Sequence, residues 1–303
     1  MQYVQTRFEN LARRIALAGV CSRRQAEDAI SQGLVSVDGK TVTKNFSVPD
    51  SADVRITKND NVVFAPPPGQ TPRLWAIGKP RGVATEAAPI AGKENIRGIR
   101  ELLVSWDARN KESFGERWVD SANLPNHFIS INHVPVMDHG IVLLTTDGEF
   151  SENMRDPRNS ILTSLRVKIS GEFLADKDPE SVFRSWRGPE GVKAAGVDFG
   201  RVFVKVLKRS SEGTAWLKID LVATRERDVS MLLHSKANIR VFRSNVDSFG
   251  PYALSSIPPG QVSVIPMRPE LLHLVPQREV KQVLLPTQLI DPKTGRMKSL
   301  VSA

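Results

Sequence analysis

The sequence predicts an α+β protein built of a small N-terminal domain and a larger, strand-rich domain. Three observations support this prediction: helix and hairpin signals within the first 60 residues, a proline-rich stretch after them, and short β-rich runs beyond it. The chain has 303 residues, enough for one large and one small domain. We expect domains at residues 1–60 and 73–266, a linker at 61–72 and a basic, proline-containing C-terminal arm at 267–303.

The composition is that of an ordinary globular protein, with 40% hydrophobic and 25% charged residues. Apolar runs stay well below the roughly 18 residues that a membrane-spanning helix needs, so no membrane partner is expected. A single cysteine, Cys21, excludes an internal disulfide framework and a cysteine-rich metal site. Proteins with a net charge near +9 often bind a nucleic acid or an anionic membrane; of these two we expect a nucleic acid, with charge-based solubility as the alternative.

Two capping boxes open the chain, at residues 6–9 and 22–25, and each predicts the start of a short helix. Valines flanking Asp38-Gly39 then predict a β-hairpin with a two-residue turn over residues 35–42. The first 18 residues are amphipathic and contain Arg7, so an organelle presequence is an alternative reading of the first helix.

The run LAGVCSRRQAEDAISQGLVSVDGKTV resembles the small RNA-binding fold of small-subunit ribosomal protein four, the S-four domain, over about residues 7–57. Arg23 and Arg24 lie in the first turn of the second predicted helix, where their side chains are well placed to hold a phosphate. Lys40 and Lys44 extend the same basic edge. A solvated charged surface is the alternative.

In the larger domain, residues 74–77 predict a strand that runs into the basic turn KPRGV. The apolar run Ile141–Leu144, closed by Asp147-Gly148, predicts a buried strand entering a tight turn. The order of S-four domain, proline linker, KPRGV and LLTTDG resembles the RsuA/RluB-type ribosomal RNA pseudouridine synthases over about residues 7–266. The resemblance implies a mixed, mainly antiparallel sheet with flanking helices.

In that family an aspartate attacks a uridine flipped out of the RNA, an arginine orients the aspartate, and a tyrosine packs under the base. The resemblance places the aspartate position on Pro135, the arginine position on His133 and the tyrosine position on Leu165. Proline has no side chain that can attack, so we expect a degenerate site with no catalytic residue. Asp138 is the fallback carboxylate, although a shift of three residues would turn the following strand over.

Several cations are expected to bind RNA, from their place in these motifs or from matching family arginines. They are Arg13, Arg14, Arg23, Arg24, Lys40, Lys44, Lys79, Arg81, Arg225, Arg227 and Arg243. No cofactor is expected and no metal, because His133, Asp138 and His139 match no closed zinc spacing. Proteins of the ribosome or its assembly are expected to contact residues 104–128 and the C-terminal arm. Trp106 and Trp118 within 104–128 are expected in the core.

The sequence therefore predicts a catalytically inactive pseudouridine synthase homologue that binds ribosomal RNA, as an assembly factor or a structural ribosome-associated protein. A site this divergent favours the mitochondrion over the cytoplasm as its location. Two alternatives stay open. One is an active synthase that uses Asp138, and the other is a protein-interaction module that no longer binds RNA.

Overall fold

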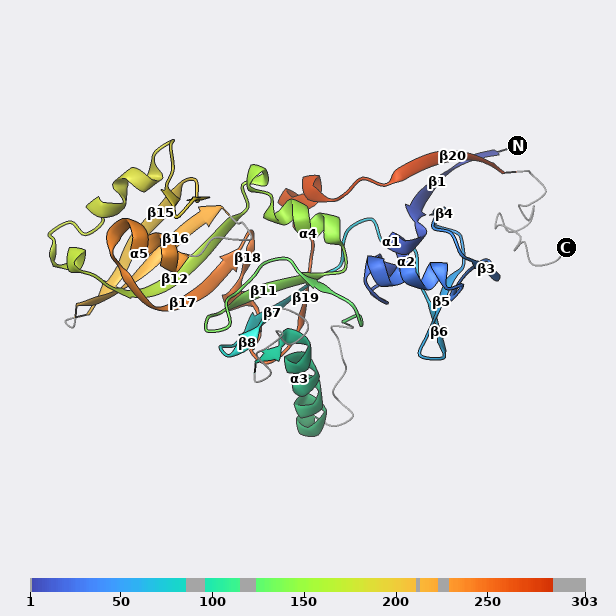
Figure 1. Ribbon diagram of the computed structural model, residues 1–303, viewed down its shortest axis with the longest axis horizontal. Helices are drawn as coiled ribbons and strands as arrows, with labels where there is room; N and C mark the ends of the chain where they lie inside the picture. Colours follow the sequence, from blue (N-terminus) through green and yellow to red (C-terminus); the bar gives the residue numbers. More distant parts are fainter. Residues whose placement is uncertain (1, 86–95, 115–123, 211–212, 223–228, 286–303) are drawn as a thin grey trace. The chain divides into compact units, whose positions relative to one another are not determined.

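The computed structural model describes residues 2–85, 96–114, 124–210, 213–222 and 229–285 (Figure 1). The chain forms two compact units, the first made of Met1–Gln70 with Pro276–Ala303 and the second of Thr71–Val275. Both mix helices with mainly antiparallel sheets, so the predicted α+β class is confirmed. In the described part of the chain, no helix has the length and apolar character to cross a membrane.

The first unit begins with a strand and two helices, β1 (Gln2–Asn10), α1 (Leu11–Leu17) and α2 (Arg23–Ser31). The capping box of α2 is formed as predicted, with the Ser22 and Gln25 side chains each accepting from the other residue's backbone N–H. The predicted helix start at residues 6–9 is wrong. These residues extend as strand because β1 pairs with β20 (Glu279–Leu285), and Asn10 caps α1 instead.

A four-stranded sheet in the order β3-β2-β5-β6 packs with these helices. Its predicted hairpin is present, because β2 (Val35–Val37) and β3 (Lys40–Val42) are joined by Asp38 and Gly39 at φ values of 49° and 77°. The other two strands are β5 (Val54–Lys58) and β6 (Asn61–Phe64). The sheet thus continues into the predicted linker, which differs from the expected boundary at residue 60.

The C-terminal region also differs from the expected arm. The 3₁₀ helix η6 (Pro269–Leu274) buries Leu271 and Leu274 in the core of the second unit. Strand β20 then belongs to the first unit, in a three-stranded sheet with β1 and β4 (Ser47–Pro49). Residues 269–285 therefore pack within their own chain, because the leucines and the strand each find an intramolecular partner.

The second unit is built on a nine-stranded sheet with the main order β15-β16-β12-β17-β11-β7-β19. Among the pairs along this order, only β11 with β17 is parallel. The strands are β7 (Leu74–Lys79), β11 (His139–Thr145), β12 (Leu162–Ser170), β15 (Val202–Arg209), β16 (Thr214–Val222), β17 (Arg240–Phe249) and β19 (Ser263–Ile265), with β10 (Ile129–Ser130) and β18 (Tyr252–Ala253) beside β11 and β17.

Shorter elements complete the second unit. They are α3 (Ile99–Phe114), α4 (Gly148–Arg155), α5 (Val229–Ala237), η2 (Pro157–Asn159), η3 (Glu172–Ala175), η4 (Ser181–Arg187), η5 (Leu254–Ser256) and the strand pairs β8 (Val83–Ala84) with β9 (Arg97–Gly98) and β13 (Lys193–Ala194) with β14 (Val197–Asp198). Figure 1 shows α5 lying across the β12–β16–β17 part of the sheet. Trp106 is buried as expected, whereas Trp118 lies outside the described residues.

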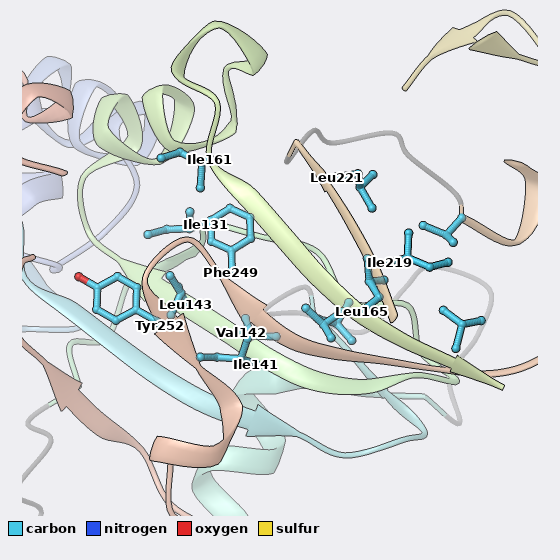
Figure 2. Packing of buried hydrophobic residues seen from close by; sticks show 14 of the residues in the cluster. Ile131, Ile141, Val142, Leu143, Ile161, Leu165, Ile219, Leu221, Phe249 and Tyr252 are labelled. Carbon is cyan, nitrogen blue, oxygen red and sulfur yellow. The ribbon is translucent and has the colours of Figure 1, made fainter. Parts of the chain in front are cut away.

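Strand β11 is the most completely buried strand of the sheet, as its apolar run predicted. Figure 2 shows Ile141, Val142 and Leu143 within the hydrophobic cluster, with Leu165 near Ile219. The predicted tight turn after β11 is wrong. Asp147 caps helix α4, because its carboxylate accepts hydrogen bonds from the backbone N–H groups of Glu149 and Phe150, each at 3.1 Å.

Candidate functional site

The candidate site is the loop of residues 132–138, which connects β10 to β11. Its side chains alternate, with Asn132 and Val134 buried and His133 and Pro135 exposed. The Asn132 amide donates to the carbonyl of Ile141 at 2.9 Å and accepts from the N–H of Leu143 at 2.9 Å. The loop is therefore fastened along the side of β11. Pro135, which the resemblance aligns with the family's aspartate, lies exposed at the surface.

Lys79, at the end of β7, lies under this loop and is fully buried. Its ammonium group donates to the carbonyls of Val83 at 2.8 Å, Asp138 at 2.9 Å and Pro80 at 3.1 Å, with Val136 at 3.5 Å. This corrects the expectation of an exposed phosphate contact. The chain folds round the ammonium group, so carbonyl dipoles replace its water shell.

The turn that follows Lys79 is bonded to the same loop. The Gly82 N–H donates to the Val136 carbonyl at 2.8 Å, and the Arg81 side chain donates to the Met137 carbonyl at 3.1 Å. Arg81 also reaches the Asn245 side chain on β17 at 2.8 Å, yet it remains exposed. Arg81 is thus the member of the KPRGV turn that a phosphate can still approach.

The strand that leaves the loop requires a glycine at its second position. A Cβ atom on Gly140 would lie 2.6 Å from the Cβ of Val246 and 2.8 Å from its backbone N and O. Leu165, Val246, Gly140 and Lys79 pair in one row across β12, β17, β11 and β7. At about 4.8 Å per strand, Leu165 lies roughly 10 Å from Gly140.

The position of Leu165 shows what this side chain does now. It is 9% exposed and pairs with Ile219 on one side and Val246 on the other, so it packs in the core (Figure 2). Leu165 thus lies in the same cross-strand row as Gly140, which follows the loop, but its side chain offers only apolar surface. The three positions that the resemblance assigns to the aspartate, the arginine and the tyrosine are occupied by Pro135 and His133 in the loop and by Leu165 on β12.

Asp138 is the acidic residue within the loop itself. It is half-buried, its backbone N–H donates to the Pro135 carbonyl at 2.9 Å, and its own carbonyl accepts from Lys79. Its neighbour His139 is also held, because the Nδ1 atom lies 2.7 Å from the carbonyl oxygen of Lys79. Across the described residues, no three histidine, cysteine or acidic side chains gather closely enough to hold a metal ion.

In the first unit, four of the cations expected to hold phosphate are exposed, whereas Arg13 and Arg14 are not. Arg23, Arg24, Lys40 and Lys44 are exposed, and Arg23 pairs with Glu27 one turn along α2 at 3.2 Å. These four residues remain the RNA-binding candidates of the first unit. Arg13 is 22% exposed and lies 3.5 Å from the carboxylate of Glu9.

Arg14 is fully buried, which corrects its assignment as an RNA contact. Its guanidinium group donates to the backbone carbonyls of Ala52 at 2.7 Å, Pro49 at 2.9 Å and Ala65 at 3.2 Å. Burial lowers the pKa of Arg14, and the nearby carboxylates, Asp50 first, act in the opposite direction. Arg14 therefore fastens two loops to α1 from inside the unit.

The remaining candidates lie on or near the large sheet. Arg243 is exposed on β17, directly opposite Lys168 on β12. Arg225 and Arg227 lie outside the described residues. Sequence reasoning missed the polar face of β15, β16 and β12, although the alternation of lysine or arginine with apolar residues in those strands is a readable signal.

Known proteins are similar to this chain in sequence. The S4 domain profile, which is the S-four domain, matches residues 11–54. The chain is 23% identical to a protein named uncharacterized RNA pseudouridine synthase from Rickettsia conorii, over 85% of this chain and 96% of that protein. It is 28% identical to ribosomal large subunit pseudouridine synthase B of Bacillus subtilis, over 54% of this chain and 57% of that protein.

A solved structure titled as a pseudouridylate synthase is 16% identical, with a TM-score of 0.49 over 88% of this chain and 99% of that chain. The S4 match and these two relatives define what the chain resembles: it carries an S4 domain and is similar to proteins named RNA pseudouridine synthases. Among them, the relative in Bacillus subtilis is of the RluB type by its name.

Proposed function

We propose that this chain binds ribosomal RNA and holds it without isomerising uridine, as an assembly factor or a structural protein of a ribosome. The observation that carries the proposal is Pro135, which stands where the chemistry needs a nucleophilic carboxylate. The RNA-facing cations argue that binding remains: Arg24, Lys40, Lys44 and Arg81 are exposed. The large-subunit name of the relative in Bacillus subtilis makes large-subunit RNA the first target to test.

The fastening of the loop supports the loss of chemistry. A carboxylate elsewhere in the loop would have to move into the place of Pro135, and the backbone of residues 136–138 is held by Lys79, Arg81 and Gly82. Releasing these hydrogen bonds would leave Lys79 buried without its acceptors, which is costly. The arginine position, His133, is also unable to form a bidentate pair with a carboxylate.

The rival function is an active synthase that uses Asp138. The feature in its favour is that Asp138 is a half-buried carboxylate in the same loop, three residues after Pro135. Pseudouridine mapping of total ribosomal RNA separates the two functions. Cells lacking the protein are compared with cells that carry the wild-type chain, Asp138→Asn, or the control Asp176→Asn, whose carboxylate is exposed in the same unit.

We expect every pseudouridine to persist in the deletion, while ribosomal particles change in their sedimentation and the wild-type protein sediments with them. Loss of one pseudouridine, restored by the wild type and by Asp176→Asn but not by Asp138→Asn, would establish the rival function. Absence of any RNA cross-link to the wild-type chain in cells would instead favour a protein-interaction module.

We also propose that the ribosome concerned is mitochondrial, since a divergent ribosome is the setting in which the family's aspartate is most readily dispensable. Subcellular fractionation with a C-terminal tag tests this part by itself. Co-sedimentation with mitochondrial ribosomal particles supports it, and co-sedimentation with cytoplasmic particles alone contradicts it.

A further inference from the structure

The sheet of the second unit has one polar face that the chemistry of the family does not need. Residues directly opposite each other in neighbouring antiparallel strands lie on the same face of a sheet. One row across β15, β16, β12 and β17 therefore consists of Lys205, Lys218, Arg166 and Asn245. The next row consists of Lys208, Trp216, Lys168 and Arg243, and a third places Arg240 opposite Ser170.

We call this surface the cation face, and its basic members are Arg166, Lys168, Lys205, Lys208, Lys218, Arg240 and Arg243. All are exposed except Lys168, which is half-buried. The opposite face of the same strands carries Val167, Leu217 and Val204, which are buried in the core together with Leu232 and Leu233 of α5. Helix α5 therefore covers the apolar face and leaves the cation face open.

The charge of this face is only partly neutralised. Asp247 pairs with Arg166 at 2.5 Å and Asp220 pairs with Lys218 at 3.3 Å, and both carboxylates lie on the same face. The other five cations have no ion pair within the described part of the chain, although Arg240 stacks on the Phe242 ring at 5.5 Å. Cations gathered without acidic partners repel one another, so the face is poised for a polyanion.

The spacing of the cations suits a nucleic acid backbone. Four neighbouring strands span about 15 Å across, and alternate residues along a strand lie roughly 7 Å apart. A phosphate chain that crosses the strands would therefore meet a cation at several successive steps. The line continues to the candidate loop, because Asn245 in the first row accepts a hydrogen bond from Arg81 at 2.8 Å.

Aromatic side chains decide which polyanion fits best. Trp216 is half-buried and stands between Lys168 and Lys208 in the second row. Phe203, which is 45% exposed, lies opposite Asp220 on the same face. Flat rings between cations are the arrangement that proteins use to stack unpaired bases while the cations hold the phosphates. An unpaired base can stack on such a ring, whereas an acidic side chain cannot, so the rings favour a nucleic acid over a run of carboxylates.

We propose that the cation face binds an RNA segment with unpaired nucleotides, with its phosphates on Lys168, Lys205 and Arg243 and a base stacked on Trp216. The class of partner rests on the proposed function, whereas the place of binding does not. The segment runs from the Arg81 turn across β17, β12 and β16 to the edge strand β15. This surface is separate from the exposed cations of the first unit.

The test uses the full chain and a fluorescein-labelled RNA hairpin with an unpaired loop, followed by fluorescence anisotropy at several salt concentrations. The face variant is Lys168→Gln with Lys205→Gln and Arg243→Gln. The matched control is Lys177→Gln with Lys193→Gln and Lys236→Gln, which removes the same charge from exposed positions outside the cation face. Trp216→Leu tests stacking, with an unbroken RNA duplex as a second probe.

We expect the face variant to bind the hairpin at least tenfold more weakly, and the control to stay within about twofold of the wild type. The salt dependence should also fall, by roughly 0.7 to 0.9 in slope for each phosphate that the variant no longer neutralises. Trp216→Leu should weaken hairpin binding by roughly tenfold and duplex binding far less, because stacking needs an unpaired base. Circular dichroism and urea titration establish that each variant is folded.

Three results would overturn the inference. If the face variant bound the hairpin with the wild-type affinity, the cation face would not be an RNA-binding surface. The proposed function would still stand if Arg23→Glu with Arg24→Glu abolished RNA binding. If the face variant lost as much affinity for polyglutamate as for the hairpin, the surface would be a general site for polyanions or acidic proteins. Failure of the wild-type chain to bind any RNA would overturn the proposed function as well.

Discussion

Among the described residues, each of the two units contains one fully buried cation, Arg14 in the first and Lys79 in the second. Each cation donates hydrogen bonds to backbone carbonyls. The acceptors of Arg14 are distant from it in the sequence, whereas Lys79 binds both the turn that follows it and the distant candidate loop. Arg14 binds three carbonyls with a rigid fork, whereas Lys79 collects four round a single nitrogen atom. Both side chains therefore act as cross-links between loops.

The two buried cations show that a basic residue in an RNA-binding family need not face the RNA. Lys79 lies two residues before Arg81, which is exposed, whereas Arg14 lies beside Arg13, which is 22% exposed and 3.5 Å from Glu9. In the second unit, the buried cation orders the backbone and its neighbour stays available for phosphate. In the second unit this ordering fixes the loop that contains Pro135.

The chain offers a separate probe for each unit. The only cysteine, Cys21, is buried in the first unit, and burial raises the pKa of its thiol, so it is slow to react while that unit is folded. Of the five tryptophans, the four that the structure describes, at positions 75, 106, 186 and 216, lie in the second unit, and the first unit's residue range contains none. Thiol labelling and tryptophan fluorescence thus report the two unfolding transitions independently.

The largest effect is expected for Lys79→Met. Methionine has a similar length but no donor, so up to four buried carbonyls lose a partner, and we expect the second unit to lose about 4 kcal/mol of stability. Urea titration followed by tryptophan fluorescence measures the loss. The exposed control Lys193→Met should change stability by less than about 0.5 kcal/mol. Equal midpoints for the two variants would mean that Lys79 is not a cross-link.

Arg14→Met should destabilise the first unit by about 3 kcal/mol, because three carbonyls lose a charged donor. The measurement is the rate of Cys21 labelling in increasing urea. Arg24→Met, an exposed arginine of the same unit, is the matched control. If Arg14→Met lowered the tryptophan transition as much as the thiol transition, the two buried cations would not act on separate units.

The sequence was sufficient for features that depend on local chemistry. The capping box at Ser22, the Asp38-Gly39 hairpin and the buried strand Ile141–Leu144 are each specified by a few neighbouring residues. The same local rules failed at residues 6–9, where pairing with β20 from the far end of the chain overrides a helix signal. The Asp147-Gly148 pair was also misread, because the Asp147 side chain caps a helix there and an Asp-Gly pair alone does not distinguish a helix start from a tight turn.

For the candidate site, the position of the loop could be predicted from the sequence, but the hydrogen bonds that hold the loop in place could not. The position of Pro135 relative to Gly140 follows from counting, and Gly140 has a physical reason in its close approach to Val246. Burial of Lys79 could not be foreseen, because its acceptors lie on a turn and on a loop more than 50 residues away. Cross-strand rows such as Lys205 with Lys218 depend on register, which alternation alone leaves undetermined.

A smaller effect is expected for Ser22→Ala in the first unit. The Ser22 hydroxyl accepts from the Gln25 N–H, and its loss removes one half of the capping box, at a cost of about 1 kcal/mol. Cys21 labelling in urea measures it, and Ser31→Ala at the opposite end of α2 is the control. A cost near that of Arg14→Met would contradict the ranking, since it would make a local cap as important as a long-range cross-link.

The smallest effect is expected for Tyr252→Phe in the second unit, and it should depend on pH. The phenol donates to the Pro266 carbonyl at 2.9 Å, so its loss should cost about 0.5 to 1 kcal/mol at neutral pH. Burial raises the pKa of Tyr252, and interaction with Arg268 only partly opposes this. The folded state therefore favours the neutral phenol, whose stabilisation is complete below the unfolded pKa of about 10.

As the pH rises from about 10 through the higher pKa of the folded state, the wild type should lose that stabilisation, whereas Tyr252→Phe has no group to ionise there. The difference in free energy of unfolding between the wild type and Tyr252→Phe should thus narrow in alkaline solution and can change sign. Tryptophan fluorescence in urea at a series of pH values measures this difference. Burial also raises the pKa of the Cys21 thiol, but Cys21 belongs to the first unit, so thiol labelling records its contribution separately. A stability difference that stays constant to the highest pH would show that the pKa of Tyr252 is the same in the folded and the unfolded state.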